Sequence, residues 1–187
     1  MKIIFIDRDG VINEYPGHFK YVTSWEGFRF LPGAIEALKK FQSAGFRVCV
    51  ISNQAGVSKG LYSQAELDRL TANMLVELTK QGVSLAGVYY CTHLKDAHCA
   101  CRKPRTGMID RALDEIAGGK KNVDLSNIFF IGDSMIDVET GRNAGMKTIM
   151  VFSGREKPEN SRGWEFKPDY TADSLLEAAR IVLKETA

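Results

Sequence analysis

Short apolar runs alternate with amphipathic helical patterns along almost the whole chain, and this alternation limits the fold more than any other feature. The candidate strands are apolar, β-branched runs at 2–6, 46–51, 87–91, 128–131 and 147–151. The candidate helices lie at 33–43, 63–81, 107–117, 136–144 and 173–184. A β-α alternation of this kind predicts an α/β fold with a doubly wound, mostly parallel sheet.

Composition limits the classes of function. With 187 residues, the chain is long enough to bury a core, and we expect a single domain over 1–187. The net charge of +2 gives no indication of a nucleic-acid partner, and no apolar run reaches the roughly 20 residues that a membrane span needs. The first residues lead into a strand rather than a signal peptide. We therefore expect a cytoplasmic protein without nucleic-acid or membrane partners.

Two aspartates follow the first candidate strand directly. Asp7 and Asp9 stand one residue apart in the segment Asp-Arg-Asp-Gly, where the strand at 2–6 should end. Ligands in open α/β sheets bind just beyond the carboxyl ends of the strands. Two carboxylates there can share Mg²⁺, and one can attack a phosphorus atom while the other handles a proton. Taken alone, however, Asp-x-Asp is better explained as a polar turn.

Three further polar motifs follow the later candidate strands. They are Ser52-Asn53-Gln54 after the second strand, Arg102-Lys103-Pro104 after the loop that follows the third, and Gly132-Asp133-Ser134 after the fourth. Each has a simpler explanation, as a cap or turn, as solvated surface charge, or as a strand-to-helix loop. Because the strand ends of a doubly wound sheet converge on one crevice, the occurrence of all four motifs in this order favours a shared site.

The combined set of residues fits phosphoryl chemistry. Asp7, Asp9 and Asp133 would supply oxygen ligands to Mg²⁺, which keeps further positions for water and substrate oxygens. The metal and Lys103 would stabilise negative charge on a transferred phosphoryl group. Ser52 could donate a hydrogen bond to the oxygens of that group. The sequence therefore predicts a magnesium-dependent site for phosphate esters.

Three of the four cysteines cluster with a histidine. Cys91-Thr-His93 is followed, after five residues, by Cys99-Ala-Cys101. In a cytosolic chain such a cluster indicates a metal site rather than disulfides. Three thiolates and one imidazole form a closed, tetrahedral structural zinc site. His98 could compete with His93 as the fourth ligand, and the Cys-x-His spacing favours His93.

The cysteine cluster immediately precedes two of the candidate site residues. We expect zinc to clamp a loop at 91–103 and to hold Arg102 and Lys103 at the phosphate site. The alternative is a set of buried or reactive thiols without a metal.

The motifs DRDG, SNQ, RKP and GDSMID resemble, in order, the four motifs of the haloacid dehalogenase superfamily of phosphohydrolases, over nearly the whole chain. The resemblance implies a Rossmann-like fold, bound Mg²⁺ and a covalent aspartyl-phosphate intermediate. It implies that Asp7 is the nucleophile and Asp9 the general acid and base, with the Asp9 backbone carbonyl contacting Mg²⁺. Ser52 and Lys103 resemble the pair that stabilises the phosphoryl group, and Asp133 resembles the metal ligand of the fourth motif.

The cysteine loop narrows the resemblance to the zinc-containing branch of histidinol-phosphatases and heptose-bisphosphate phosphatases. This branch implies a capless fold with a zinc-bound loop. The five-residue gap before Cys99 resembles histidinol-phosphatases and some heptose phosphatases. Segments 53–60 and 103–108 resemble the heptose enzymes, although Thr92, Ser52 and Ala55 depart from their usual residues. We favour hydrolysis of the 7-phosphate of D-glycero-D-manno-heptose 1,7-bisphosphate, with histidinol phosphate as the alternative substrate.

The resemblance assigns substrate recognition to a hairpin-like flap at about 11–30 and to the cations of the site. The residues expected to bind substrate are Tyr15, Pro16, Gly17, His18, Asn53, Gln54, Ala55 and Arg102. Arg102 suits a second phosphate because a guanidinium makes bidentate contacts. His18 could equally be a solvated loop residue.

A non-enzymatic function is the remaining alternative, as a zinc-stabilised binding module with a degenerate site. The presence of Asp7, Asp9, Lys103 and Asp133 argues against it. We expect a monomer that binds a small phosphorylated metabolite. The sequence leaves open the role of Asp137 and the structure of the polar stretch at 153–170.

Overall fold

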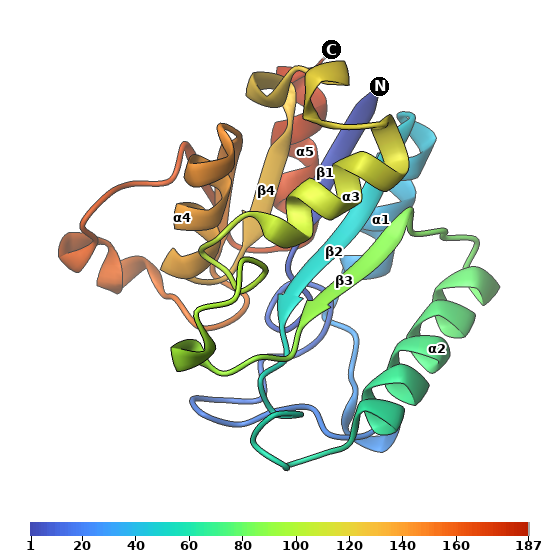
Figure 1. Cartoon of the computed structure of the whole chain (residues 1–187). Helices are drawn as coiled ribbons and strands as arrows, with labels where there is room; N and C mark the ends of the chain where they lie inside the picture. The colour runs from blue at the N-terminus through green and yellow to red at the C-terminus, as the bar shows by residue number, and fades with distance from the viewer. Residues whose placement is uncertain (187) are drawn as a thin grey trace.

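The computed structural model describes residues 1–186 and contains one sheet of six parallel strands, in the order β3-β2-β1-β4-β5-β6 (Figure 1). The strands are β1 Lys2–Ile6, β2 Phe46–Asn53, β3 Gly87–Cys91, β4 Phe129–Gly132, β5 Lys147–Val151 and β6 Tyr170–Ala172. The α-helices are α1 Ala34–Ser43, α2 Gln64–Lys80, α3 Gly107–Ala117, α4 Met135–Ala144 and α5 Leu175–Glu185. The predicted doubly wound α/β fold is therefore confirmed. Within the described residues, no helix combines the length and apolar character needed to cross a membrane.

The differences from the predicted elements lie at strand ends and in the polar stretch. β2 continues through Ser52 and Asn53, which pair with β3. The stretch 153–170 contains a 3-10 helix at Pro158–Gly163 and leads into β6, which the sequence analysis missed. β6 has only three residues, so it is too short to produce an apolar pattern.

The order of the strands creates a crevice at the centre of the sheet. The chain moves outward from β1 to β2 and β3, and then returns to the other side of β1 as β4. Ligand sites in open α/β sheets lie at this switch point, beyond the carboxyl ends of the strands. The backbone N–H of Asp7 donates to the carbonyl of Ile131 at 2.9 Å, which ties the loop after β1 to β4.

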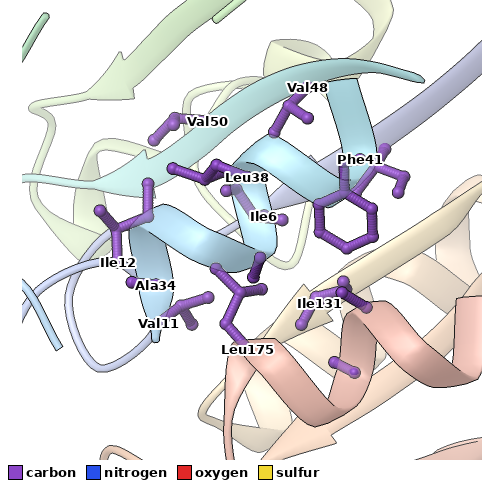
Figure 2. Close-up of a cluster of buried hydrophobic side chains, with 14 of the residues drawn as sticks. Ile6, Val11, Ile12, Ala34, Leu38, Phe41, Val48, Val50, Ile131 and Leu175 are labelled. Atoms are coloured by element: carbon purple, nitrogen blue, oxygen red, sulfur yellow. The ribbon is translucent and has the colours of Figure 1, made fainter. Parts of the chain in front are cut away.

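Both faces of the sheet are buried. In β1, Ile4 and Ile6 belong to a core with α1, α2 and α5, whereas Ile3 and Phe5 belong to a core with α3 and α4. Figure 2 shows Leu38 of α1 among the side chains of the first core. This two-sided burial explains why the strands consist of continuous apolar runs rather than alternating ones.

Two insertions extend over the carboxyl edge of the sheet. One is the flap that follows β1, and the other is the loop between β3 and α3. Each holds only a 3-10 helix, at Trp25–Gly27 and at Lys95–Ala97. The predicted hairpin of the flap is limited to its base, where Asn13 forms an antiparallel bridge with Phe30. The short insertions leave the crevice without an additional folded domain among the described residues.

Candidate active site

A cavity of about 440 Å³ opens at the crevice, and residues of all four sequence motifs line it. The predicted residues on its wall are Asp7, Asp9, Ser52, Asn53, Ala55, Arg102, Lys103 and Asp133. The flap contributes its predicted residues Tyr15, Pro16, Gly17 and His18. The convergence expected from the strand order therefore occurs for every predicted substrate-site residue except Gln54.

Lys103 lies at the centre of the site and is almost fully buried. Its Nζ donates to Asp7 Oδ2 at 2.9 Å, to Asp137 Oδ1 at 2.6 Å and to the carbonyl of Ile51 at 2.9 Å. Asp137 is also the N3 residue of a capping box at the start of α4, where its Oδ2 accepts hydrogen bonds from Ser134. The structure thus gives Asp137 a place that the sequence left open, as a second anchor for the lysine.

Burial and the neighbouring charges shift the pKa values of Asp7, Asp133 and Lys103. Burial raises the pKa of Asp7 to about 6, with Lys103 opposing the shift and Asp137 adding to it. Burial and the neighbouring Asp137 and Asp7 carboxylates raise the pKa of Asp133 well above its usual value. Burial acts to lower the pKa of Lys103, but Asp137 and Asp7 outweigh it and raise that pKa. Three carboxylates around one ammonium group leave an excess of negative charge.

The carboxylate group fits a divalent cation. Oxygens of Asp7, Asp133 and Asp137 all lie within 4.8 Å of one another. A β-carbon on Gly10 would come 2.1 Å from Asp133 Oδ2, and one on Gly154 would come 2.0 Å from it. Two glycines therefore leave the space that this carboxylate occupies. Hard oxygen ligands of this kind, with room for solvent, suit Mg²⁺.

The side chain of Asp9 does not belong to that carboxylate group. It accepts hydrogen bonds from Arg8, Asn13 and Gln54. Gln54 is fully buried, and its carbonyl oxygen accepts a hydrogen bond from Tyr62 at 2.7 Å. Gln54 does not line the cavity, and its amide is directed to Asp9. Its predicted contact with the substrate stays a prediction.

Asn53 links β2 to the end of the cysteine loop. Its Oδ1 accepts from the backbone N–H of Lys103 at 3.1 Å, and its Nδ2 donates to the carbonyl of the same residue at 3.2 Å. Both ends of the amide are thus used to hold Lys103, although Asn53 also lines the cavity. Asn53 therefore has a structural role in fixing the backbone of Lys103, which the sequence did not indicate. Its predicted role in binding substrate stays a prediction.

The structure brings the four expected zinc ligands together. The Sγ atoms of Cys91, Cys99 and Cys101 lie 3.3–3.7 Å apart, and His93 Nδ1 lies 3.3 Å from Cys101 and 3.6 Å from Cys91. Zn–S bonds of about 2.3 Å in a tetrahedron place the sulfurs about 3.8 Å apart, close to these separations. A metal ion can therefore fit among them, and His98 is not part of the group.

The mouth of the cavity is strongly basic. Lys20, Lys59, Lys95 and Arg155 line it together with Arg102. The Arg102 guanidinium donates to the carbonyl of His93 at 2.9 Å and also borders a second cavity of about 490 Å³. The sequence analysis missed Arg155, whose backbone N–H donates to Asp133 Oδ2 at 2.7 Å. This hydrogen bond fixes the start of the polar stretch at the site, a contact that no local pattern signals.

Known proteins are similar to this chain in sequence. A family model described as HAD-hydrolase-like, for the haloacid dehalogenase superfamily, matches residues 100–178. The D-glycero-beta-D-manno-heptose-1,7-bisphosphate 7-phosphatase of Pasteurella multocida is 32% identical, with 97% of this chain and 96% of the relative covered. The D-glycero-alpha-D-manno-heptose-1,7-bisphosphate 7-phosphatase of Campylobacter jejuni is 36% identical, with 89% of this chain and 90% of the relative covered.

The fold comparison agrees with these relatives. The crystal structure of the D,D-heptose 1,7-bisphosphate phosphatase from B. bronchiseptica, complexed with magnesium and phosphate, superimposes with a TM-score of 0.88. Its sequence is 29% identical, and 99% of each chain is covered. The sequence relatives, the fold and the converged motifs agree: the chain belongs to the haloacid dehalogenase superfamily, in the family of the D-glycero-manno-heptose-1,7-bisphosphate 7-phosphatases.

Proposed function

We propose that this chain is a magnesium-dependent phosphatase that removes the 7-phosphate of D-glycero-D-manno-heptose 1,7-bisphosphate. The observation that carries the proposal is the cavity itself, in which acidic residues and Lys103 form the base while four further lysine and arginine side chains and Arg102 surround the mouth. A reacting phosphate at Asp7 and a second phosphate at the mouth would match this distribution of charge.

The same distribution favours the heptose substrate over histidinol phosphate. Histidinol phosphate carries one phosphate and a positively charged amine. Its amine would face the basic side chains Lys20, Lys59, Lys95, Arg102 and Arg155. Like charges brought together in a partly buried site are unfavourable, whereas a second phosphate would pair with them.

The residues support a two-step reaction. A carboxylate oxygen of Asp7 attacks phosphorus, and the bond between phosphorus and the sugar oxygen breaks as Asp9 gives that oxygen a proton. A water then attacks the phosphorus and gives its proton to Asp9. The bond between phosphorus and Asp7 breaks, so that inorganic phosphate leaves and both carboxyl groups return to their starting state.

The cations stabilise the charge that develops during both steps. Lys103 lies within 2.9 Å of the attacking carboxylate, where it also offsets the charge of the phosphoryl oxygens. Ser52 lies beside it on the cavity wall and can donate a hydrogen bond to those oxygens. Mg²⁺, held by Asp7, Asp133 and the backbone carbonyl of Asp9, would supply further charge stabilisation.

We assign zinc to the group of Cys91, His93, Cys99 and Cys101, with a structural role. Four protein ligands leave no open position for a substrate or water. The last ligand stands two residues before Lys103, so the metal would fix the loop that carries the lysine. A cytoplasmic location and a monomeric state stay predictions.

Substrate preference is the first prediction. With Mg²⁺, the protein should release phosphate from heptose 1,7-bisphosphate with a kcat/KM at least ~100-fold above that for histidinol phosphate, because the mouth of the cavity binds a second anion. Steady-state phosphate release should be measured with both anomers of the heptose. A preference for histidinol phosphate would refute the substrate assignment.

Replacement of the nucleophile is the second prediction. Asp7→Asn should lower phosphate release by ~10⁴-fold or more, since the amide cannot form the covalent intermediate. Circular dichroism should show an intact fold, because the two side chains have nearly the same shape. Asp114→Asn, on the exposed face of α3, is the matched control and should retain full activity. Normal turnover by Asp7→Asn would disprove the assignment of the nucleophile.

Metal content tests the zinc site. The purified protein should hold about one zinc ion per chain, and Cys101→Ser should lose it together with thermal stability. Cys49→Ala is the control, since Cys49 is a buried cysteine that is not among the four clustered side chains. Elemental analysis and a thermal melt provide the measurements. An unchanged zinc content in Cys101→Ser would contradict the assignment.

A further inference from the structure

Arg8 is a fully buried charged residue that the reaction described above does not use. It stands between Asp7 and Asp9 in sequence, and its backbone N–H donates to Asp7 Oδ1 at 2.7 Å. Its guanidinium is directed to Asp9, and the ring of Tyr90 lies 5.5 Å from its centre. A buried arginine requires a specific partner, because the loss of its hydration is costly.

The guanidinium holds the Asp9 carboxylate by both oxygens. Arg8 Nη2 lies 2.9 Å from Asp9 Oδ1 and 3.0 Å from Oδ2, and Arg8 Nε lies 3.1 Å from Oδ1. Asn13 donates to Oδ1 at 2.8 Å, and Gln54 donates to Oδ2 at 2.9 Å. Donors on several sides fix both the plane and the rotation of the carboxylate.

The two oxygens of Asp9 differ in the number of donors that they face. A carboxylate oxygen has about two lone-pair positions, and Oδ1 already faces three donor nitrogens from Arg8 and Asn13. Oδ2 faces one nitrogen of Arg8 and one of Gln54. Since Asp9 lines the cavity with 18% of its side chain exposed, Oδ2 is the oxygen better able to exchange a proton with a bound group.

Stability alone does not account for this arrangement. Buried ion pairs contribute little to stability compared with well-packed apolar residues of the same volume. A catalytic acid, in contrast, depends on being held within a fraction of an ångström of the atom that receives its proton. Gln54 directly follows β2 and Asn13 lies at the base of the flap, so the supporting groups hold Asp9 against two separate parts of the chain.

We propose that Arg8 is a positioning residue, which together with Gln54 and Asn13 orients the Asp9 carboxylate so that Oδ2 exchanges protons with the leaving oxygen and with water. The proposal rests on the proposed function, because it concerns the acid of that same reaction. In the first step the Oδ2–H bond breaks and an O–H bond forms on the sugar oxygen. In the second step the attacking water returns a proton to Oδ2.

The test compares leaving groups that do and do not need a proton. A sugar alkoxide needs one, whereas p-nitrophenolate leaves as a stable anion. Arg8→Lys keeps the charge but loses the two-pronged contact with Asp9. It should lower kcat on heptose 1,7-bisphosphate by ~100-fold, with KM nearly unchanged. The pre-steady-state burst of p-nitrophenolate should stay within about threefold of wild type.

Two further variants keep the test decisive. Gln54→Met removes one donor to Oδ2 without removing a charge. It should lower kcat on heptose 1,7-bisphosphate by a smaller factor than Arg8→Lys and retain the p-nitrophenolate burst. This variant keeps the proposal testable if Arg8→Lys fails to fold. Asp9→Asn should also lower kcat on heptose 1,7-bisphosphate and retain the p-nitrophenolate burst. Adding Arg8→Lys to Asp9→Asn should lower that kcat by no more than about twofold further. Met74→Ala, in the core of α2, is the control for a general loss of stability and should change both substrates equally.

The outcomes separate this inference from the proposed function. Selective loss on the heptose substrate in Arg8→Lys or Gln54→Met supports the positioning role. Equal losses of the burst and of heptose turnover, as in Met74→Ala, would overturn it while leaving the phosphatase assignment in place. A wild-type protein that hydrolyses neither substrate would overturn the proposed function and this inference together.

Discussion

The buried ion pairs that Lys103 forms with Asp7 and Asp137 connect every part of the site. Lys103 reaches both carboxylates from the loop after β3, whereas Asp7 follows β1 and Asp137 lies in the first turn of α4. Buried charges are tolerated only when they are paired, so the three segments must meet in one geometry. The proposed nucleophile Asp7, the carboxylate group around it and the start of α4 therefore depend on a single ammonium group.

Two other features of the structure lie next to the backbone of Lys103. Asn53 clamps the backbone of Lys103 to the end of β2, and the four side chains of the proposed zinc site lie together just before it in the chain. A long, flexible lysine side chain loses much rotational freedom on burial, and anchoring its backbone lowers that cost. The described residues in this way present a rigid cation in the cavity, whose wall also includes residues of the flap and five basic side chains.

The sequence predicted those features that depend on local pattern and on topology. Apolar runs placed the strands, and the rule that strand ends converge placed Asp7, Ser52 and Asp133 at one crevice. The sequence could not predict the hydrogen bond from Gln54 to Asp9, because the two residues lie 45 positions apart and only the packed structure brings them together. The same holds for β6 and Arg155, which tertiary contacts define, and for Arg8, which resembles an exposed turn residue until its burial is known.

A double-mutant cycle on Lys103 tests the central claim most directly. Without added metal, Lys103→Met should lower the free energy of unfolding by about 3–5 kcal/mol, because it leaves buried carboxylates unpaired. Lys103→Met combined with Asp137→Asn should cost at least ~1 kcal/mol less than the sum of the two single changes, as expected for residues in direct contact. Urea denaturation measures each value. Losses that add to within about 0.5 kcal/mol would contradict the claim that this ion pair holds the site together.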